Sequence, residues 1–303
     1  MTNIIVITGP TATGKTTVGA MLAKLLDGEV VSADSMQVYK YMDIGTAKPS
    51  EAEMLGIRHH MLSIVEPGDN YSAARYISDA AKCIDDIAAR GKVPILVGGT
   101  GLYIDSLISG RTFSARGDAA LRKSLEDLYD RIGGEAMHKR LGKFDPISAK
   151  KLSINDKKRI VRAFEVFNTT GKTISQHDID SRSLPDRYNA TKIALAFGSR
   201  ALLYSRIEKR VDSMVSNGLE NEVRSLLDMG ISPKATAMQA IGYRQMAQAI
   251  MQELPMEETI ETIKMETRRY AKRQLSWLRR DETIRWVSWE TALALGKEPI
   301  EWL

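Results

Sequence analysis

Residues 9–16 of the chain read GPTATGKT, and they directly follow a strand-like segment with the apolar run IIVI at residues 4–7. They match the phosphate-loop pattern G-x-x-x-x-G-K-[ST], which joins a buried strand to a helix. Apolar side chains at helical spacing follow the loop, at Val18, Met21, Leu22 and Leu25. This context favours a bound polyphosphate over a simple strand-to-helix turn, but it does not say which diphosphate or triphosphate is held.

The residue types of this loop suit an anion. Glycine at each end lets successive backbone N–H groups point inward, while Lys15 adds a positive charge and the Thr16 hydroxyl can reach a magnesium ion. A helix that begins at about Lys15 also directs its positive dipole end toward the same place. We therefore expect Mg²⁺ as the cofactor of this site.

Strands and helices alternate along the first hundred residues. Strand-like residues 29–31 and 93–97 flank a helical stretch at about 73–90, whose apolar residues recur at i, i+3, i+4 and i+7. This alternation predicts an α/β fold, a P-loop NTPase-like parallel sheet flanked by helices. Ligands bind such sheets at the carboxyl ends of the strands, where the phosphate loop, Asp34 and Thr100 all fall.

The pattern becomes helical and strongly charged between about Thr112 and Asp186, without further buried strands. We interpret residues 112–186 as an α-helical insertion domain, and residues 1–111 with 187–303 as a discontinuous catalytic core. In the second part of the core we expect a strand at 190–197, helices to about Arg279 and a last strand at 284–287.

The chain has 303 residues, of which 43% are hydrophobic and 27% charged, as in a globular protein of one or two domains. Its single cysteine, Cys83, excludes an intramolecular disulfide and is expected to be a packed thiol. No apolar stretch approaches the roughly 20 residues that cross a bilayer, and the first strand leaves no room for a signal peptide. We therefore expect a cytoplasmic protein with no membrane association, and nothing in the sequence requires more than a monomer.

Two polar residues at the predicted edge of the sheet are candidates for chemistry. Asp34 can serve as a general base, and it can equally be a helix N-cap or a magnesium ligand. Thr100 lies among three glycines, which allow close approach to a ligand and are also typical of a tight turn. The pair His59-His60 has no partner at metal-ligand spacing, so we expect a structural role in a loop for it.

Basic residues dominate the C-terminal part of the chain. Residues 264–285 contain eight Lys or Arg against three acids, within a formal net charge of +5 for the whole chain. The side chains of Arg269, Lys272, Arg273 and Arg280 share one face of a predicted helix. A second basic group lies at residues 157–162, and together the two groups favour a phosphate-backbone partner over a merely solvated face.

Six segments, in order along nearly the whole chain, resemble the tRNA dimethylallyltransferase family, also called isopentenyl-tRNA transferases. Besides the phosphate loop, these are residues 32–39 (SADSMQVY), 42–49 (MDIGTAKP), 97–103 (VGGTGLY), 241–245 (IGYRQ) and 272–279 (KRQLSWLR). The phosphate loop is shared with many enzymes, whereas DIGTAKP together with KRQ-x-x-WLR is specific. Some members of the family carry an added C-terminal zinc finger, and the single cysteine points instead to the compact bacterial form.

The resemblance implies transfer of a dimethylallyl group from dimethylallyl diphosphate to N6 of the adenosine on the 3′ side of the tRNA anticodon. It implies that Asp34 takes the N6 proton, that Thr100 positions the amine and donor, and that Mg²⁺ bridges the diphosphate with the help of Thr16. The donor would be held by Gly9, Thr11, Ala12, Thr13, Gly14, Lys15, Thr16 and Arg224. The anticodon stem-loop would be held by Asp34, Ser35, Met36, Gln37, Thr100, Arg122, Lys158, Arg159, Arg162, Gly242, Tyr243, Arg244, Lys272, Arg273, Gln274, Trp277 and Arg279.

Two other functions compete with this one. A phosphate-loop kinase would use ATP on a small hydroxyl or nucleoside substrate, with Asp34 as its base. No acid follows the strand at residues 95–97, where a nucleotide hydrolase usually carries its magnesium-binding aspartate, and this weakens the use of ATP. A non-catalytic RNA-binding module would explain the basic helix and leave the phosphate loop unexplained.

Overall fold

The computed structural model describes residues 1–111, 118–183 and 185–293. The chain divides into two compact units, Met1–Ile108 with Arg187–Leu303, and Ser109–Asp186. The domain limits expected from the sequence, at residues 111–112 and 186–187, remain predictions, because residues 112–117 lie outside the described residues. Within the described residues, no helix is both long and apolar enough to span a membrane.

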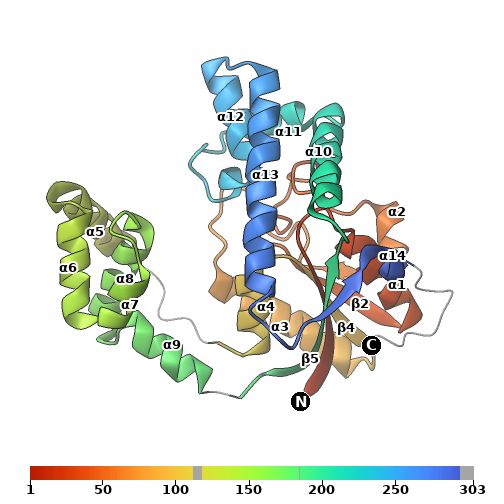
Figure 1. The fold of residues 1–303 in the computed structure, drawn as a ribbon, viewed down its shortest axis with the longest axis horizontal. Helices are drawn as coiled ribbons and strands as arrows, with labels where there is room; N and C mark the ends of the chain where they lie inside the picture. Colours follow the sequence, from red (N-terminus) through yellow and green to blue (C-terminus); the bar gives the residue numbers. More distant parts are fainter. Residues whose placement is uncertain (112–117, 184, 294–303) are drawn as a thin grey trace. The chain divides into compact units, whose positions relative to one another are not determined.

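The larger unit is built on a six-stranded sheet in which every paired strand is parallel (Figure 1). The order across the sheet is β3-β2-β4-β1-β5-β6. The strands are β1 (Thr2–Thr8), β2 (Gly28–Ala33), β3 (His59–His60), β4 (Val93–Gly98), β5 (Tyr188–Ala196) and β6 (Arg285–Ser288). The α/β fold expected from the sequence is confirmed. His59 and His60 form the short edge strand, whereas a structural loop was expected for them.

Helices cover both faces of the sheet, and the alternation of side chains along β1 explains why. Ile4 and Val6 belong to one buried core with α3 (Ala73–Ala89), whereas Ile7 belongs to a second core with α1 (Lys15–Leu25). The other helices of this unit are α2 (Glu51–Met54), α4 (Gly101–Ile108), α10 (Arg200–Ser216), α11 (Leu219–Asp228), η1 (Ala237–Gln239), α12 (Tyr243–Gln252), α13 (Met256–Leu278) and α14 (Trp289–Leu293). Cys83 is half-buried in α3, and burial raises the pKa of its thiol.

The described residues of the smaller unit contain helices and no strand. These helices are α5 (Ala119–Ile132), α6 (Gly134–Phe144), α7 (Pro146–Lys151), α8 (Lys157–Thr170) and α9 (Ile174–Arg182), packed around Met137, Leu141, Ile160 and Ala163. Arg122 and Arg162 both contact the buried Glu165, at 3.0 Å and 2.7 Å. Lys158 and Arg159 are exposed, and they line a surface hollow with Arg162.

A buried carboxylate ties β2 to α3 and the edge strand of the larger unit. The Arg90 guanidinium contacts both oxygens of Glu29, with Nη2 2.8 Å from Oε2, and His60 Nε2 lies 2.7 Å from the same oxygen. Hydrogen bonds from Arg90 lower the pKa of Glu29 to about 2. The charged form of Glu29 therefore stabilises the fold at neutral pH.

The mutation Glu29→Gln is expected to lower the free energy of unfolding by about 1–3 kcal/mol at pH 7, because it removes a buried charge that Arg90 and His60 both contact. A group whose pKa is depressed in the folded state loses its contribution as the pH falls from its ordinary value, 4.5, toward 2. The difference between wild type and variant should therefore shrink below pH 4.5 in urea unfolding curves. Asp27→Asn, at an exposed ion pair with Lys92, is the control. A difference that is independent of pH would contradict this role.

Candidate active site

The phosphate loop takes a strained course that only small residues allow. Gly9 and Gly14 have φ angles of 139° and 75°, and a Cβ atom on Gly9 would lie 2.6 Å from the Leu195 carbonyl oxygen. Thr13 closes the turn by donating its hydroxyl to the Pro10 carbonyl at 2.8 Å. Lys15 donates from Nζ to the same carbonyl, also at 2.8 Å. The turn requires glycine at position 9, because a side chain there would collide with β5.

Two residues from distant helices hold the loop from outside. Gln274 of α13 accepts a hydrogen bond from the Thr11 N–H at 2.8 Å and donates to the Gly99 carbonyl at 3.0 Å. Arg206 of α10 donates from Nε to the Ala12 carbonyl at 3.1 Å. Gln274 is buried, and it joins the phosphate loop to the end of β4.

A cavity of about 100 Å³ lies against the loop, and cations from two helices line it. Lys15 and Thr16 come from the start of α1, and Arg210 comes from α10. Burial and the neighbouring Arg210 lower the pKa of Lys15 to about 7, and burial also lowers the pKa of Arg210 below its ordinary value. Among the described residues Arg210 has no ion-pair partner. Two half-buried cations therefore face one acid, Asp34, which favours a bound anion.

Arg224, the arginine expected to bind the donor diphosphate, does not line this cavity. It lies on α11 with its side chain 52% exposed, and its guanidinium contacts Glu220 at 2.7 Å. Arg210 lines the cavity instead, and the sequence analysis did not predict this role for it. The available signal was its spacing: Arg206 and Arg210 are one helical turn apart, which places both on the face of α10 toward the loop.

Asp34 and Thr100 meet at the carboxyl ends of the neighbouring strands β2 and β4. Asp34 Oδ1 accepts the N–H groups of Met36 at 2.8 Å and Gln37 at 3.3 Å, so it caps the turn that follows the strand. In the described part of the chain, Oδ2 accepts no hydrogen bond. Thr100 Oγ1 accepts the Ser35 N–H at 3.1 Å. One oxygen of Asp34 is therefore structural and the other is available to a ligand.

A second, larger cavity of about 360 Å³ opens on the other side of Asp34. Four residues line both cavities: Thr11, Asp34, Arg210 and Tyr270. Burial and the nearby Asp34 raise the pKa of Tyr270 to about 12, so its hydroxyl stays neutral. Two substrates that enter separate cavities would therefore meet at the Asp34 carboxylate.

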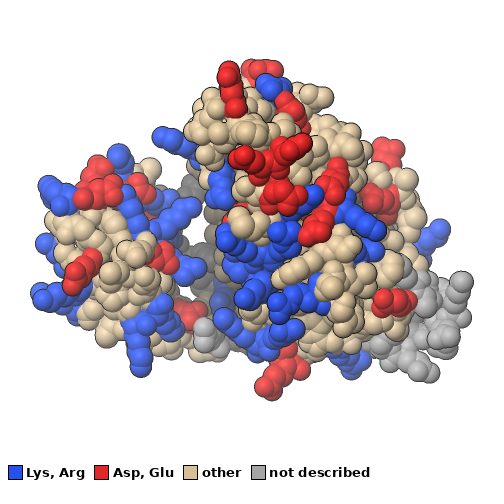
Figure 2. All heavy atoms as spheres, turned by 45° about the horizontal axis from the view of Figure 1, so that its top comes forward, with Lys and Arg blue, Asp and Glu red and all other residues tan. Residues whose placement is uncertain are grey.

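The structure separates the residues of this unit that were expected to hold RNA. Ser35, Met36, Arg244 and Arg273 line the second cavity, whereas Lys272 and Arg279 line a separate groove of about 370 Å³. Lys and Arg side chains gather on the face that carries α13, as Figure 2 shows.

Four other residues expected to hold RNA make internal contacts. Trp277 donates from Nε1 to Asp105 at 2.9 Å and packs so closely on Gly101 that a Cβ there would lie 2.4 Å from its ring. Tyr243 is fully buried, and Gly242 donates its N–H to Gln245 at the start of α12. Gln37 is also buried, with its amide nitrogen bonded to the Thr46 and Ala47 carbonyls.

Gln274→Ala is expected to weaken the binding of inorganic diphosphate about tenfold, because two backbone groups that shape the loop lose their partner. Calorimetric titration of the folded protein with diphosphate and Mg²⁺ measures this change. Gln248→Ala, on the exposed face of α12, should bind diphosphate like the wild type. Equal affinities for all three proteins would show that Gln274 does not shape the loop.

The chain is similar to known proteins along nearly its whole length. Residues 37–281 match the family model described as IPP transferase. The tRNA dimethylallyltransferase of Acetivibrio thermocellus is 46% identical over 289 residues, covering 95% of this chain and 92% of its own length. That of Carboxydothermus hydrogenoformans is 45% identical over 299 residues, covering 98% and 94%.

Solved structures that are similar to this chain are also of transferases that act on tRNA. The full-length tRNA isopentenylpyrophosphate transferase of Bacillus halodurans has a TM-score of 0.71 at 40% identity, covering 95% of this chain and 90% of that one. A eukaryotic dimethylallyltransferase described as acting on tRNA has a TM-score of 0.81 at 30% identity, covering 95% and 74%. With its phosphate loop, its paired cavities and these matches, the chain belongs to the IPP transferase family.

Proposed function

We propose that this protein transfers a dimethylallyl group from dimethylallyl diphosphate to N6 of adenosine 37, next to the anticodon of tRNA, and releases diphosphate. The observation that carries the proposal is the position of Asp34 between two cavities. One is small and lined by Lys15 and Arg210, as a diphosphate requires. The other is larger, its lining includes the apolar side chains of Val211, Met214 and Ile263, and it has room for a nucleobase.

The reaction forms a bond between N6 and the first carbon of the dimethylallyl group, while the bond from that carbon to the diphosphate oxygen breaks. The diphosphate leaves with the electron pair, and Lys15 and Arg210 stabilise its negative charge. The amine of adenine is a weak nucleophile, and Asp34 accepts its proton as the new bond forms. Thr100, fixed beside Ser35, helps to position the amine and the donor.

Mg²⁺ fits this site through the diphosphate rather than through a set of protein ligands. No cluster of three or more His, Cys, Asp or Glu side chains that could hold a metal occurs among the residues that the structure describes. The hydroxyl-bearing Thr16 lines the cavity together with Asp34. Thr16 would hold the ion, which when bound adds positive charge to neutralise the leaving group.

The RNA substrate has to offer its base outside the anticodon-loop stack, since both reacting groups meet within a cavity. Arg244 and Arg273 line the second cavity and are suited to the phosphates that flank the flipped base. Lys158, Arg159 and the other basic residues of the helical unit would contact the anticodon stem. We propose that the protein acts as a monomer, in the cytoplasm where its substrate occurs.

Label transfer tests the proposed reaction against a kinase. Purified protein is incubated with unmodified tRNA and Mg²⁺, and with dimethylallyl diphosphate or ATP labelled in the group to be transferred. We expect label to enter the RNA from the prenyl donor and none from the terminal phosphate of ATP. Label that enters the RNA or a nucleoside from ATP would support the kinase instead. If the protein binds RNA but transfers label from neither donor, the result would support a non-catalytic RNA-binding module.

Asp34→Asn is expected to lower the turnover number by about 10²–10⁴-fold, the usual contribution of a general base. The asparagine oxygen can still accept the Met36 and Gln37 N–H groups, so the turn is kept and only the base is lost. Affinity for tRNA should stay within about twofold in filter-binding measurements. The exposed Asp69→Asn is the control. A collapse of RNA affinity with an unchanged turnover number would make Asp34 an anchor for RNA.

A further inference from the structure

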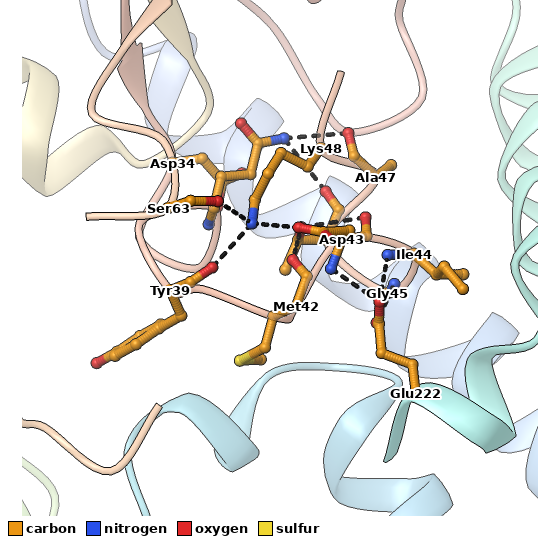
Figure 3. Close-up of polar contacts among 12 residues, drawn as sticks. Asp34, Tyr39, Met42, Asp43, Ile44, Gly45, Ala47, Lys48, Ser63 and Glu222 are labelled. Atoms are coloured by element: carbon orange, nitrogen blue, oxygen red, sulfur yellow. Dashed lines mark hydrogen bonds and ion pairs between the residues drawn. The ribbon is translucent and has the colours of Figure 1, made fainter. Parts of the chain in front are cut away.

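A turn at residues 43–48, which reads DIGTAK, forms part of the wall of both cavities. Gly45 and Thr46 line the larger cavity, and Ala47 lines the phosphate cavity. The turn contains no strand and no regular helix that could fix its backbone. Its shape must therefore be set by contacts with other parts of the chain (Figure 3).

One carboxylate accepts three successive backbone N–H groups of this turn. Glu222 Oε2 lies 2.9 Å from the Asp43 nitrogen and 2.8 Å from the Ile44 nitrogen, and Oε1 lies 3.1 Å from the Gly45 nitrogen. Three converging N–H groups form a site of the kind that binds anions. Here the anion is a side chain from α11, which comes from a distant part of the sequence.

Tyr243 completes this contact from α12. Its hydroxyl donates to Glu222 Oε1 and accepts the Gly45 N–H at 3.1 Å. Tyr243 is fully buried, and burial and the Glu222 charge raise its pKa above the ordinary value, so it remains a neutral donor. The ring packs so closely that a Cβ on Gly45 would lie 2.4 Å from it, which explains the glycine at this position.

The far end of the turn is joined to the residues that follow β2, which include Asp34. Gln37 Nε2 donates to the Thr46 and Ala47 carbonyls at 3.2 Å and 3.1 Å, and the Gln37 N–H is capped by Asp34. Lys48 Nζ donates to the Tyr39 carbonyl at 2.8 Å and to Ser63 Oγ at 2.7 Å, and it also contacts Asp43. A continuous set of hydrogen bonds thus runs from Glu222 through the turn to Asp34.

We propose that Glu222 is a positioning residue, which holds the 43–48 turn so that the wall of the larger cavity presents the target base to Asp34. This inference rests on the proposed function, because it takes the larger cavity to be the place of the adenine. Glu222 does not line either cavity and acts only through the turn. The donor site is formed mainly by the phosphate loop and Arg210, and the turn residue that lines it, Ala47, lies at the end held by Gln37, so this site should respond little to Glu222.

The test compares Glu222→Gln with two control variants. Glutamine keeps the size of the side chain, but it removes the charge and turns one accepting oxygen into a donor that faces N–H groups. Glu220→Gln changes an acid two residues away that pairs only with the exposed Arg224. Leu226→Val removes a buried methylene group from the same helix and serves as a variant of reduced stability with the turn contacts intact.

For Glu222→Gln we expect the turnover number to fall at least tenfold and the KM for tRNA to rise, with the KM for dimethylallyl diphosphate within twofold of wild type. Hydrogen exchange of the amides of residues 43–45 should become faster in this variant and stay unchanged in Glu220→Gln. Tyr243→Phe should give a smaller effect, and the double variant should lose less than the product of the two single losses.

Two outcomes would overturn this role. The first is wild-type kinetics for Glu222→Gln. The second is that Leu226→Val, at an equal loss of thermal stability, changes KM and the turnover number as much as Glu222→Gln does. If the wild type itself transfers no label from dimethylallyl diphosphate, the proposed function fails. The exchange measurement then still reports whether Glu222 holds the turn, so the two failures are distinguishable.

Discussion

Two cations and one carboxylate, brought together at the edge of a parallel sheet, are the constraint on which the site depends. Lys15 and Arg210 sit half-buried against Asp34, and water cannot fully compensate the excess of positive charge. A bound polyanion relieves this imbalance. The same electrostatic arrangement that favours donor binding in the ground state therefore also favours departure of the diphosphate.

The long helix α13 contacts the phosphate loop and lines both cavities. Along one helix, Tyr270 lines both cavities, Arg273 lines the larger one, Gln274 fixes the phosphate loop and Trp277 packs on Gly101. Spacings of three and four residues keep these side chains on adjoining faces. A displacement of this helix would disturb the donor loop and the RNA cavity at the same time, which couples the two substrates.

The sequence predicted best those features that depend on neighbours in the chain. The phosphate loop, Asp34 and Thr100 follow strands directly, and in a parallel sheet the strand ends meet at one edge. Arg210, Gln274 and Glu222 act through contacts across the fold, and periodicity cannot say which residue a side chain will meet. Arg224 was expected to bind the donor diphosphate because its segment resembles the family. In the structure it lies on the exposed face of α11 and contacts Glu220. Tyr243, Gln274 and Trp277 were expected to hold RNA, whereas in the folded chain they make internal contacts.

The strand order has a consequence for how the protein is made on the ribosome. β1 lies inside the sheet and pairs with β5, so that Thr2 is opposite Tyr188. At about 5–20 residues per second, the partner of the first strand is synthesised roughly 10–40 seconds later. During that interval one edge of β1 has its hydrogen-bonding groups unpaired, a state prone to mispairing with other nascent chains. The other four strands, β3, β2, β4 and β1, are synthesised long before β5 and β6, and β1 then provides the edge to which β5 is added.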